Sequence, residues 1–475
     1  NNAVQLDGSA KLPAVDGSQL TGMASGGTVS LVADGAITAG KPCILTAAGK
    51  AKQVAELGNN VTGGVGTVAS FTGNNSNYAD ITDIGSDKYL ISYSDGQNSN
   101  YPTVAVATQS GENKTLTFDT AVVVSSNACQ NTTIEWDSNA SKALVAWRKD
   151  HVSNGFLYGH NVTVSGTTPT VSSSTDIYTS ASTYYPTSIY NPDAQRVMVG
   201  FVYGSSNYVR WQTYDLSGST PSQDEQLEWT SSFAPLGNTG MEQRLDYDTV
   251  NNKFLVAWNT TGDAVYGCLI TDTGSGMSNA TKFEIKSATA TNPTCNYDVT
   301  AGKWLVTYND GDNSYYKTAV AITYNSGTAN TNADIGTPVV LDSRVLNQSS
   351  VASSYDTNSS VTTIINGNAS STDSGKAGYY SVKLTGTVPS LVSSGSIDGT
   401  SQYDISRIQM PRQHMTTETP YYPVAFVGGG WQGNGDKAYY GVYTTVQTAT
   451  TNLTNSNYLG VAAETISDTN TGKIT

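Results

Sequence analysis

Charged side chains are scarce in this sequence. Its 475 residues include 24 Lys and Arg and 38 Asp and Glu, together 13% of the chain, where a soluble domain usually has about a quarter. Disordered chains combine low hydrophobicity with high charge and few aromatic residues, whereas here 29 Tyr, 8 Phe and 7 Trp are spread along the chain. We therefore expect a folded, all-β protein with a surface of hydroxyls and amides, as on extracellular or virion proteins.

Basic clusters and long apolar runs are missing as well. The formal net charge is −14, and no group of Lys and Arg could neutralise a row of phosphates, so we expect neither nucleic-acid binding nor attraction to anionic lipid. No apolar run approaches the roughly 18 residues of a membrane helix, so no membrane insertion is expected. The start, Asn1-Asn-Ala-Val-Gln5, does not resemble a signal peptide, which indicates a trimmed N-terminus or a piece of a longer chain.

Cysteine is limited to four isolated residues, Cys43, Cys129, Cys268 and Cys295. Zinc sites and disulfide frameworks show closer spacing of Cys and His residues than this. We therefore expect four free, buried thiols.

The sequence contains an internal repeat. A short apolar strand recurs every 50 to 61 residues and usually ends in an aromatic residue. Its clear copies are Lys88-Tyr-Leu-Ile-Ser-Tyr93, Lys142-Ala-Leu-Val-Ala-Trp147, Arg196-Val-Met-Val-Gly-Phe201, Lys253-Phe-Leu-Val-Ala-Trp258 and Lys303-Trp-Leu-Val-Thr-Tyr308, and its weaker copies are Ser360-Val-Thr-Thr-Ile-Ile365 and Tyr421-Tyr-Pro-Val-Ala-Phe426. A period of this length is typical of repeat architectures.

Each unit predicts four short antiparallel strands. An aromatic residue followed by Asp or Asn precedes five of the copies, as in Trp136-Asp137 and Tyr247-Asp248, and Asp and Asn favour turns because they bond their own backbone. A polar loop, a strand that often begins with Tyr and a last short strand follow each copy. No segment has a sustained helical period, so the helix content should be near zero.

Four strands in each of seven units predict a seven-bladed β-propeller over residues 61–449. A β-solenoid is the competing architecture, but its coils are shorter and would not repeat a four-strand unit. The segment Gly66-Thr-Val-Ala-Ser-Phe71 resembles the last strand of a blade. We expect it to complete the seventh blade and so join the first blade to the last.

The flanking sequence predicts where the propeller is inserted. Residues 26–60 and 450–475 have short strands and Gly-containing turns of one style, and we interpret them as two halves of a small β-domain. Residues 1–25 form a stem or linker before it. Insertion of a domain is tolerated where chain ends lie close together, which holds for a propeller closed by its own ends. The pattern is still running at Thr475, so more sequence is expected to follow.

Two segments resemble bacteriophage virion fibre proteins of the tail-fibre or capsid-fibre and decoration type. The first is the stem phrase Val4-Gln-Leu-Asp-Gly-Ser-Ala-Lys-Leu-Pro-Ala-Val-Asp-Gly-Ser-Gln-Leu-Thr-Gly22, and the second is the looser pattern Asp34-Gly-Ala-Ile, Gly40-Lys-Pro-Cys and Gly460-Val-Ala-Ala. The resemblance implies a homotrimer on the head or tail surface of a virion. It also implies contacts with other virion proteins and a distal module that touches a glycan or protein of the host cell.

Catalytic motifs are incomplete. Ser94-Asp-Gly96 and Asn309-Asp-Gly311 match only part of the Asp-box turn of sialidase-type propellers. The chain has three His, and no Gly-x-Ser-x-Gly elbow accompanies them. Paired carboxylates for glycoside hydrolysis leave no spacing rule in a sequence. The sequence therefore predicts a protein without catalytic activity, with a glycan-active propeller enzyme as the disfavoured alternative.

One loop is a calcium candidate. Asp310-Gly-Asp312-Asn-Ser314 places several oxygen atoms close together, and calcium prefers oxygen ligands. The bidentate Glu of an EF-hand loop is missing, so a solvated turn is favoured over a site formed by Asp310 and Asp312. No other cofactor is expected.

The loops that follow the core strands are the better functional candidates, because the repeat places all of them on one face of the ring. They mix Tyr and Trp with amides and hydroxyls, as binding loops do. Candidate ligand-binding residues are Trp431 in a Gly-rich loop, Tyr184, Tyr185, Tyr315 and His151. The alternative for most of these Tyr residues is packing between blades.

These observations lead to one functional prediction. The chain is expected to be a non-catalytic virion fibre or appendage protein that attaches to host-surface glycan through the loop face of the propeller. The alternatives are a purely structural capsid or tail decoration protein, a glycan-active propeller enzyme and a secreted lectin.

Overall fold

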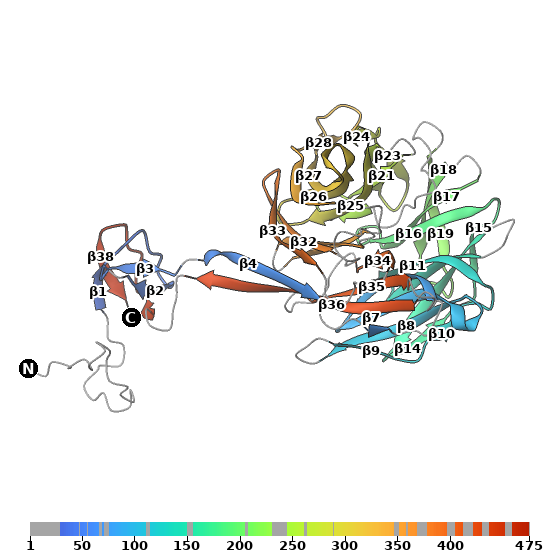
Figure 1. The fold of residues 1–475 in the computed structure, drawn as a ribbon, viewed down its shortest axis with the longest axis horizontal. Helices are drawn as coiled ribbons and strands as arrows, with labels where there is room; N and C mark the ends of the chain where they lie inside the picture. Colours follow the sequence, from blue (N-terminus) through green and yellow to red (C-terminus); the bar gives the residue numbers. More distant parts are fainter. Residues whose placement is uncertain are drawn as a thin grey trace, which may run out of the picture. The chain divides into compact units, whose positions relative to one another are not determined.

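The computed structural model describes residues 29–474 except 47, 55, 66–68, 71–75, 111–114, 150–154, 205–207, 230–244, 261–263, 288, 346–350, 358–359, 368–377, 397–403, 412–420, 430–436 and 452–457. The chain divides into two compact units, Asn1–Asn60 with Gln447–Thr475, and Val61–Val446 (Figure 1). Within the described residues the secondary structure is strand, apart from short 3-10 turns at η2 (Gly96–Asn98) and η4 (Gly311–Asn313). No helix found there is long and apolar enough to span a membrane.

The larger unit is built from seven antiparallel sheets, the blades of a β-propeller. Blade 1 contains β6 (Ser76–Gly85), β7 (Lys88–Asp95), β8 (Tyr101–Ser110), β9 (Thr115–Phe118) and β10 (Val122–Val123). Blade 2 contains β11 (Cys129–Asp137), β12 (Lys142–Lys149), β13 (Leu157–Ser165), β14 (Thr168–Val171) and β15 (Thr175–Tyr178). Blade 3 contains β16 (Thr183–Asn191), β17 (Arg196–Tyr203), β18 (Tyr208–Asp215) and β19 (Ser222–Trp229).

The remaining blades follow the same order. Blade 4 contains β20 (Leu245–Asp248), β21 (Lys253–Asn259), β22 (Val265–Asp272), β23 (Met277–Asn279) and β24 (Phe283–Lys286). Blade 5 contains β25 (Ala290–Asp298), β26 (Lys303–Asp310), β27 (Tyr316–Tyr324), β28 (Ala333–Ile335) and β29 (Val339–Val345). Blade 6 contains β30 (Val351–Asp356), β31 (Val361–Asn366), β32 (Gly378–Thr385) and β33 (Val388–Ser396). Blade 7 contains β34 (Asp404–Gln409), β35 (Tyr421–Gly429) and β36 (Lys437–Thr451), with β4 (Glu56–Val65) and β5 (Ala69–Ser70) pairing to β36.

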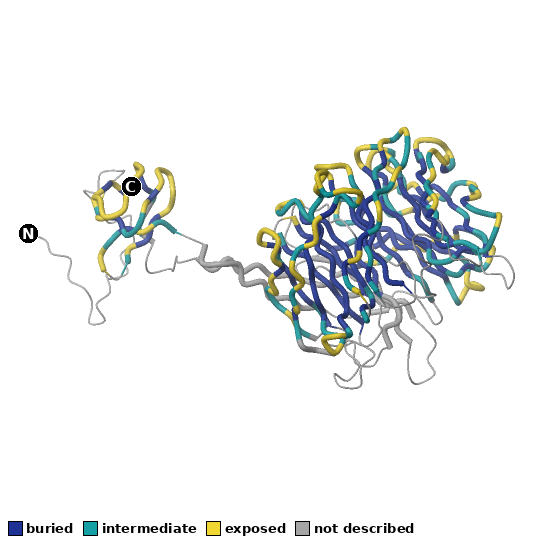
Figure 2. The backbone as a smooth tube through the Cα atoms, turned by 90° about the horizontal axis from the view of Figure 1, so that it is seen from above, coloured by how far each residue is buried: buried dark blue, intermediate teal, exposed yellow. Residues whose placement is uncertain are grey.

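In blades 1 to 6 the second strand is buried on both faces because neighbouring sheets pack face to face. In β12, Val145 and Trp147 pack against blade 1, while Leu144 and Ala146 pack against blade 3. A strand covered on both faces is an unbroken apolar run rather than an alternating one, which is the pattern that the repeat shows. Figure 2 shows these buried strands in the larger unit, with exposed turns at their ends.

The ring closes between blade 7 and blade 1. The first strands of successive blades contact one another in turn, from β6 to β34, and β34 contacts β6 again. Ala69 pairs with Tyr440 and Ser70 with Tyr439, so the expected N-terminal contribution to the seventh blade is confirmed for β5. Closure of this kind leaves only short, protected sheet edges. The prediction of an all-β fold with a seven-bladed propeller is thereby confirmed.

The aromatic-Asp steps form the expected turns. The Asp137 carboxylate accepts hydrogen bonds from the backbone N–H groups of Asn139 and Ala140, and Asp248 accepts them from Val250 and Asn251. The same carboxylate oxygens therefore satisfy N–H groups that the tight turn leaves without a strand partner.

The aromatic residue of the same step joins the blades. The Tyr355 hydroxyl of blade 6 donates to Asp298 Oδ1 of blade 5 at 2.8 Å, and the Tyr247 hydroxyl of blade 4 donates to Asp193 in the turn of blade 3. Tyr190 of blade 3 lies against Asp137 of blade 2 in the same way. One dipeptide thus makes its own turn and fastens its blade to the preceding one.

The smaller unit combines residues from both ends of the chain. It contains β1 (Val29–Val32), β2 (Pro42–Leu45), β3 (Ala51–Gln53), β37 (Tyr458–Val461) and β38 (Thr471–Ile474). Strand β1 pairs with β38, and β2 pairs with β3 and β37. Ala33, Ile37 and Cys43 share one core with Ala462, Ile466 and Ile474.

The two segments of this unit are related by an approximate two-fold repeat. Ile37 and Ile466 exchange backbone N–H···O bonds of 2.8 and 2.7 Å, and the bond from Ala33 N–H to Asn470 is mirrored by the bond from Ala462 N–H to Lys41.

All four cysteines of the protein are free and buried, which confirms the expectation from their spacing.

We expect Tyr355→Phe to lower the free energy of unfolding by about 1 kcal/mol, because it removes the hydroxyl that joins blade 6 to Asp298. Thermal or urea unfolding of the full chain measures this change. Tyr315→Phe is the matched control, since the Tyr315 hydroxyl makes no hydrogen bond with any described residue. Equal stability of the two variants would show that the inter-blade bond contributes nothing.

We also expect the protein to lose stability as the pH rises from about 10 to 12. Burial raises the pKa of Tyr203 and of Tyr355 to about 12, and it raises the pKa of Tyr89, Tyr214 and Tyr308 further. In this window the unfolded chain releases protons that the folded chain retains, so unfolding becomes easier. Tyrosinate absorbance and unfolding midpoints should therefore change together, and full ionisation by about pH 10.5 without loss of stability would contradict this.

Candidate functional site

The ends of the second strands define the face on which the candidate binding residues were expected. Two of the five, His151 and Trp431, lie outside the described residues. The other three are placed in two different blades, Tyr184 and Tyr185 in blade 3 and Tyr315 in blade 5. The described structure therefore brings Tyr184 and Tyr185 together but does not bring Tyr315 to them.

Tyr184 and Tyr185 lie at a bulge of strand β16, with ring centroids 6.4 Å apart. Tyr184 is half-buried against the core shared by blades 3 and 4, and the Arg148 guanidinium of blade 2 lies 4.8 Å from the centroid of its ring. Tyr185 has a φ of +50°, a conformation that is uncommon for a bulky residue. Tyr184 is thus a packing and cation–π residue between blades.

Tyr315 belongs to a turn that blades 1 and 5 share. In both blades an Asp caps a short 3-10 turn, and the next residues have positive φ: Asp95 is followed by Ser99 and Asn100, and Asp310 by Ser314 and Tyr315. Asn tolerates this conformation well, whereas Tyr adopts it rarely. The turn is therefore a structural repeat, and Tyr315 is its unusual member.

The structure places a lysine side chain beside Asp310 and Asp312, the two weak calcium candidates. The Lys286 ammonium lies 3.3 Å from Asp310 Oδ1 and 2.7 Å from Asp312 Oδ2, so a cation of the protein occupies the position between the two carboxylates. Asp310 also accepts the Asp312 N–H and the Asn313 side-chain amide. No group of His, Cys, Asp and Glu that could hold a metal is found among the described residues.

A cluster between blades 2 and 3 contains the residue types of a catalytic centre. The Arg210 guanidinium lies between the rings of Tyr178 and Tyr203, 4.8 and 4.9 Å from their centroids, and pairs with Glu228 at 2.5 Å. Burial, together with Glu228, raises the pKa of Tyr203 to about 12. Tyr203 is therefore protonated at neutral pH, and the cluster serves to hold the two blades together.

Lys317 is the unusual ionisable residue of the described propeller. Its side chain is 0% exposed, and its ammonium nitrogen has no hydrogen-bond partner. It lies on the same side of β27 as Ala319 and Ala321, which pack against blade 6. Burial alone lowers its pKa to about 7. A buried lysine of this kind is partly neutral at physiological pH.

Other polar atoms without partners lie at the same end of the seam between blades 5 and 6. Lys317 pairs across the sheet with Asn309, and Asn309 pairs with Thr291. The Thr291 hydroxyl and both polar atoms of the Asn366 side chain lack hydrogen-bond partners. Asn366 is on the same side of β31 as Ile364, which packs against blade 5. Buried polar atoms are normally paired, so this concentration marks the candidate site.

Sequence reasoning missed Lys317, although the repeat contains a signal. Lys317 pairs with the residue that follows the last aromatic of the core strand. In blades 1 to 4 the residues at that position are Pro102, Leu157, Val209 and Val265. Without knowledge of how the second and third strands pair, a lysine near the start of a strand is interpreted as an ordinary surface residue.

Comparison with known proteins found similar solved structures at low sequence identity. No protein-family model matches the sequence, and no curated protein is similar to it. A solved structure of a protein from Lactobacillus plantarum is similar over 76% of this chain and 96% of its own, with 12% identity and a TM-score of 0.45. A putative 6-phosphogluconolactonase from Bacteroides uniformis is similar over 78% and 97%, with 10% identity and a TM-score of 0.47. NanB, solved with Optactamide, is similar over 78% and 68%, with 12% identity and a TM-score of 0.42.

These comparisons contradict the prediction of a non-catalytic attachment or decoration protein. One of the similar structures bears the name of an enzyme, a putative 6-phosphogluconolactonase. At this identity the likeness concerns the fold alone, and a fold does not define a function. The reactive groups of a propeller can come from different blades and then have no fixed spacing, so the absence of a catalytic motif in the sequence does not decide between the two functions.

We expect calcium and EDTA to leave the thermal unfolding midpoint of the protein unchanged, because Lys286 already neutralises Asp310 and Asp312. Lys286→Met should lower the midpoint, and added calcium should restore part of the loss, since the two carboxylates then have no cation. Differential scanning fluorimetry at fixed ionic strength measures all four conditions. A calcium-dependent rise in the unaltered protein would reinstate the metal site.

Proposed function

We propose that the protein is a propeller enzyme that acts on a carbonyl compound, with the Lys317 amine as its reactive group. The observation that supports this most directly is the complete burial of Lys317 without a hydrogen-bond partner. Strongly perturbed ionisable groups concentrate at functional sites. The proposal rests on the chain's own residues.

The energetics favour a functional reason for this lysine. With a pKa of about 7 in the folded protein and an ordinary value near 10.5 in the unfolded chain, its burial costs on the order of 4 kcal/mol at neutral pH. An apolar residue at the same place, as in four other blades, would avoid this cost. Residues that break a local rule in this way are expected at functional sites.

The chemistry follows from the protonation state. At pH 7 about half of the Lys317 side chains are neutral amines, and a desolvated amine is a nucleophile toward carbonyl carbon. As the new N–C bond forms, the electron pair of the C=O bond moves to oxygen. The Asn366 amide and the Thr291 hydroxyl have donors without partners at the same end of the seam, and such donors stabilise a developing oxyanion.

The test is selective trapping of the amine. The full chain is incubated at pH 7 with a small aldehyde and cyanoborohydride, and modified lysines are located by peptide mass spectrometry. We expect Lys317 to react ahead of Lys303, which lies in the same blade and donates to the Ala301 carbonyl. Modification of surface lysines without modification of Lys317 under native conditions would contradict the proposal.

Turnover is tested with the same pair of lysines. We expect the protein to process members of a panel of lactones, esters, aldehydes and ketones, and Lys317→Met to lose at least a hundredfold of that activity, whereas Lys303→Met retains it. A panel without turnover, together with an unreactive Lys317, would reject the proposed function.

Loss of activity in Lys317→Met can be separated from loss of fold. We expect this variant to be more stable than the parent at pH 7, because it removes a buried ionisable group. Between pH 10.5 and 7 the unfolded chain binds a proton that the folded chain does not, so the parent should lose stability relative to the variant as the pH falls through this window. Unfolding midpoints of both proteins from pH 6 to 10 measure the difference, and parallel curves would contradict it.

The setting of the enzyme is a separate part of the proposal. The resemblance of residues 4–22 and of the flanking segments to phage fibre proteins supports an enzyme carried on a virion surface as a homotrimer. Light scattering of the full chain tests the trimer, and antibody labelling of purified particles tests the location. A monomer, or unlabelled particles, would remove this part and leave the chemistry of Lys317 to its own test.

A further inference from the structure

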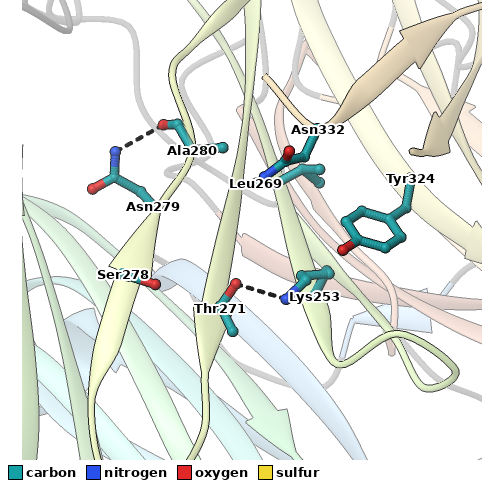
Figure 3. Close-up of a pocket in the computed structure, with 8 residues that line it drawn as sticks. All are labelled: Lys253, Leu269, Thr271, Ser278, Asn279, Ala280, Tyr324 and Asn332. Carbon is teal, nitrogen blue, oxygen red and sulfur yellow. Dashed lines mark hydrogen bonds between the residues drawn. The ribbon is translucent and has the colours of Figure 1, made fainter. Parts of the chain in front are cut away.

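A cavity of about 90 Å³ lies between blades 4 and 5, at the opposite end of β27 from Lys317 (Figure 3). Blade 4 contributes Lys253, Thr271, Ser278 and Asn279 to its lining, and blade 5 contributes Tyr324 and Asn332. The lining includes one cation, several hydroxyls and amides, and no carboxylate. The cavity is therefore polar, with the Lys253 ammonium as the charged group of its lining, and it has room for several water molecules or a small ligand group.

Lys253, the cation of the cavity, occupies a position that is equivalent in several blades. The first residue of the second strand is basic in blades 1 to 5, namely Lys88, Lys142, Arg196, Lys253 and Lys303. In blades 1 and 2 it reaches the turn between the third and fourth strands of the next blade. Lys88 donates to the Gly166 carbonyl at 2.8 Å, and Lys142 donates to the Ser217 and Gly218 carbonyls at 2.9 and 2.6 Å.

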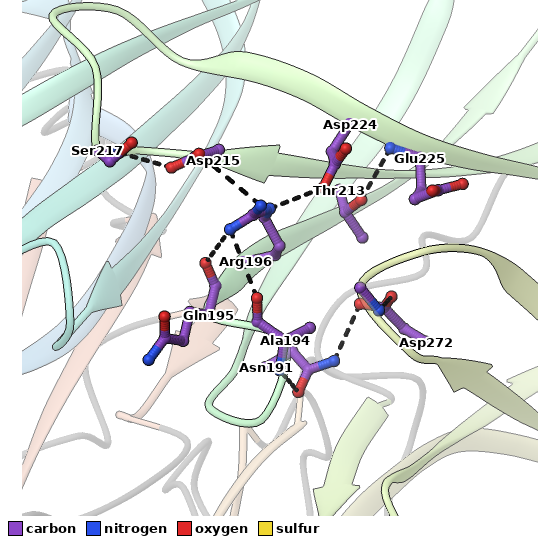
Figure 4. Close-up of polar contacts among 11 residues, drawn as sticks. Asn191, Ala194, Gln195, Arg196, Thr213, Asp215, Ser217, Asp224, Glu225 and Asp272 are labelled. Atoms are coloured by element: carbon purple, nitrogen blue, oxygen red, sulfur yellow. Dashed lines mark hydrogen bonds and ion pairs between the residues drawn. The ribbon is translucent and has the colours of Figure 1, made fainter.

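The basic residues of blades 3 and 5 also donate hydrogen bonds to carboxylate or backbone carbonyl oxygens. Arg196 bonds Asp224 at 2.8 Å and the carbonyls of Ala194 and Gln195 (Figure 4). Lys303 donates to the Ala301 carbonyl at 3.2 Å. Four of the five repeated cations are thus held by backbone carbonyls or carboxylates.

Lys253 is the exception. Its hydrogen bond within the described structure goes to the Thr271 hydroxyl at 2.9 Å, and its ammonium lies 5.6 Å from the centroid of the Tyr324 ring. The corresponding turn of the next blade, residues 325–332, is longer than residues 166–167 of blade 2. The ammonium therefore meets a ring and a cavity where Lys88 and Lys142 meet carbonyl oxygens.

We infer that this cavity binds a small oxyanion, a carboxylate or an inorganic anion, whose oxygens take the place of the carbonyls that Lys88 and Lys142 reach in their blades. Ammonium-to-oxyanion hydrogen bonds are stronger than neutral ones, and the hydroxyls of Thr271 and Ser278 can donate to the remaining oxygens. Burial lowers the pKa of Lys253, and the carboxylate of Asp248, its cross-strand neighbour, opposes this shift without cancelling it. This site is independent of Lys317 and of the proposed function.

The experiment measures anion binding by the full chain. Sodium acetate, glucuronate and phosphate are titrated at constant ionic strength, which removes general screening, and binding is followed by calorimetry and by the unfolding midpoint. We expect saturable binding with a rise in the midpoint. Binding of acetate and glucuronate would identify the carboxylate of a larger molecule, and binding of phosphate alone would identify an inorganic anion.

Two variants separate this site from non-specific binding. Lys253→Met should weaken the affinity at least tenfold, whereas Lys303→Met, at the equivalent position of blade 5, should leave it unchanged. Ser278→Asp places a carboxylate in the lining at an exposed position, where it competes for Lys253 and repels an anion, so it should abolish binding. Equal binding by all variants, or no saturable binding by the parent, would overturn the inference.

Discussion

The contact between adjacent blades is the constraint on which the rest of the structure depends. Each sheet is too small to bury both of its faces alone, so it must be covered on each side by a neighbour. The Tyr of the aromatic-Asp step takes part in this contact twice, with its ring in the apolar seam and its hydroxyl on the turn of the preceding blade, as for Tyr247 and Asp193. The closure by β5 and the buried core strands follow from satisfying this contact around a ring.

Because the blades repeat the same positions, a residue that differs in kind from its equivalents in the other blades is a candidate for a role beyond packing. Lys317 places an amine where four other blades have an apolar side chain or proline, and Lys253 places an ammonium where its equivalents meet backbone carbonyls or carboxylates. Both departures leave polar groups incompletely satisfied in a seam between blades. A sequence under selection for stability alone would remove them. The two seams on either side of blade 5 are therefore the places where this propeller differs from a purely structural ring.

The agreement between sequence and structure has a definite limit. The strand repeat, the aromatic-Asp turns and the contribution of residues 69–70 to the last blade depend on neighbours in sequence or on a fixed period, and all were predictable. The pairing of Asp310 and Asp312 with Lys286 could not be predicted, because Lys286 comes from a different strand. Lys317 was missed because its burial depends on blade 6.

The sequence by itself determined the all-β architecture, the number of blades and the free state of the cysteines, since apolar periodicity and turn chemistry are local properties that repeat along the chain. Only the tertiary structure decided which ionisable groups lost their solvent and which found a partner. Desolvation and pairing depend on groups brought together from separate blades, tens of residues apart in the chain. The chemistry of Lys317 and Lys253 is therefore a property of the seams between blades, which no single segment of the sequence contains.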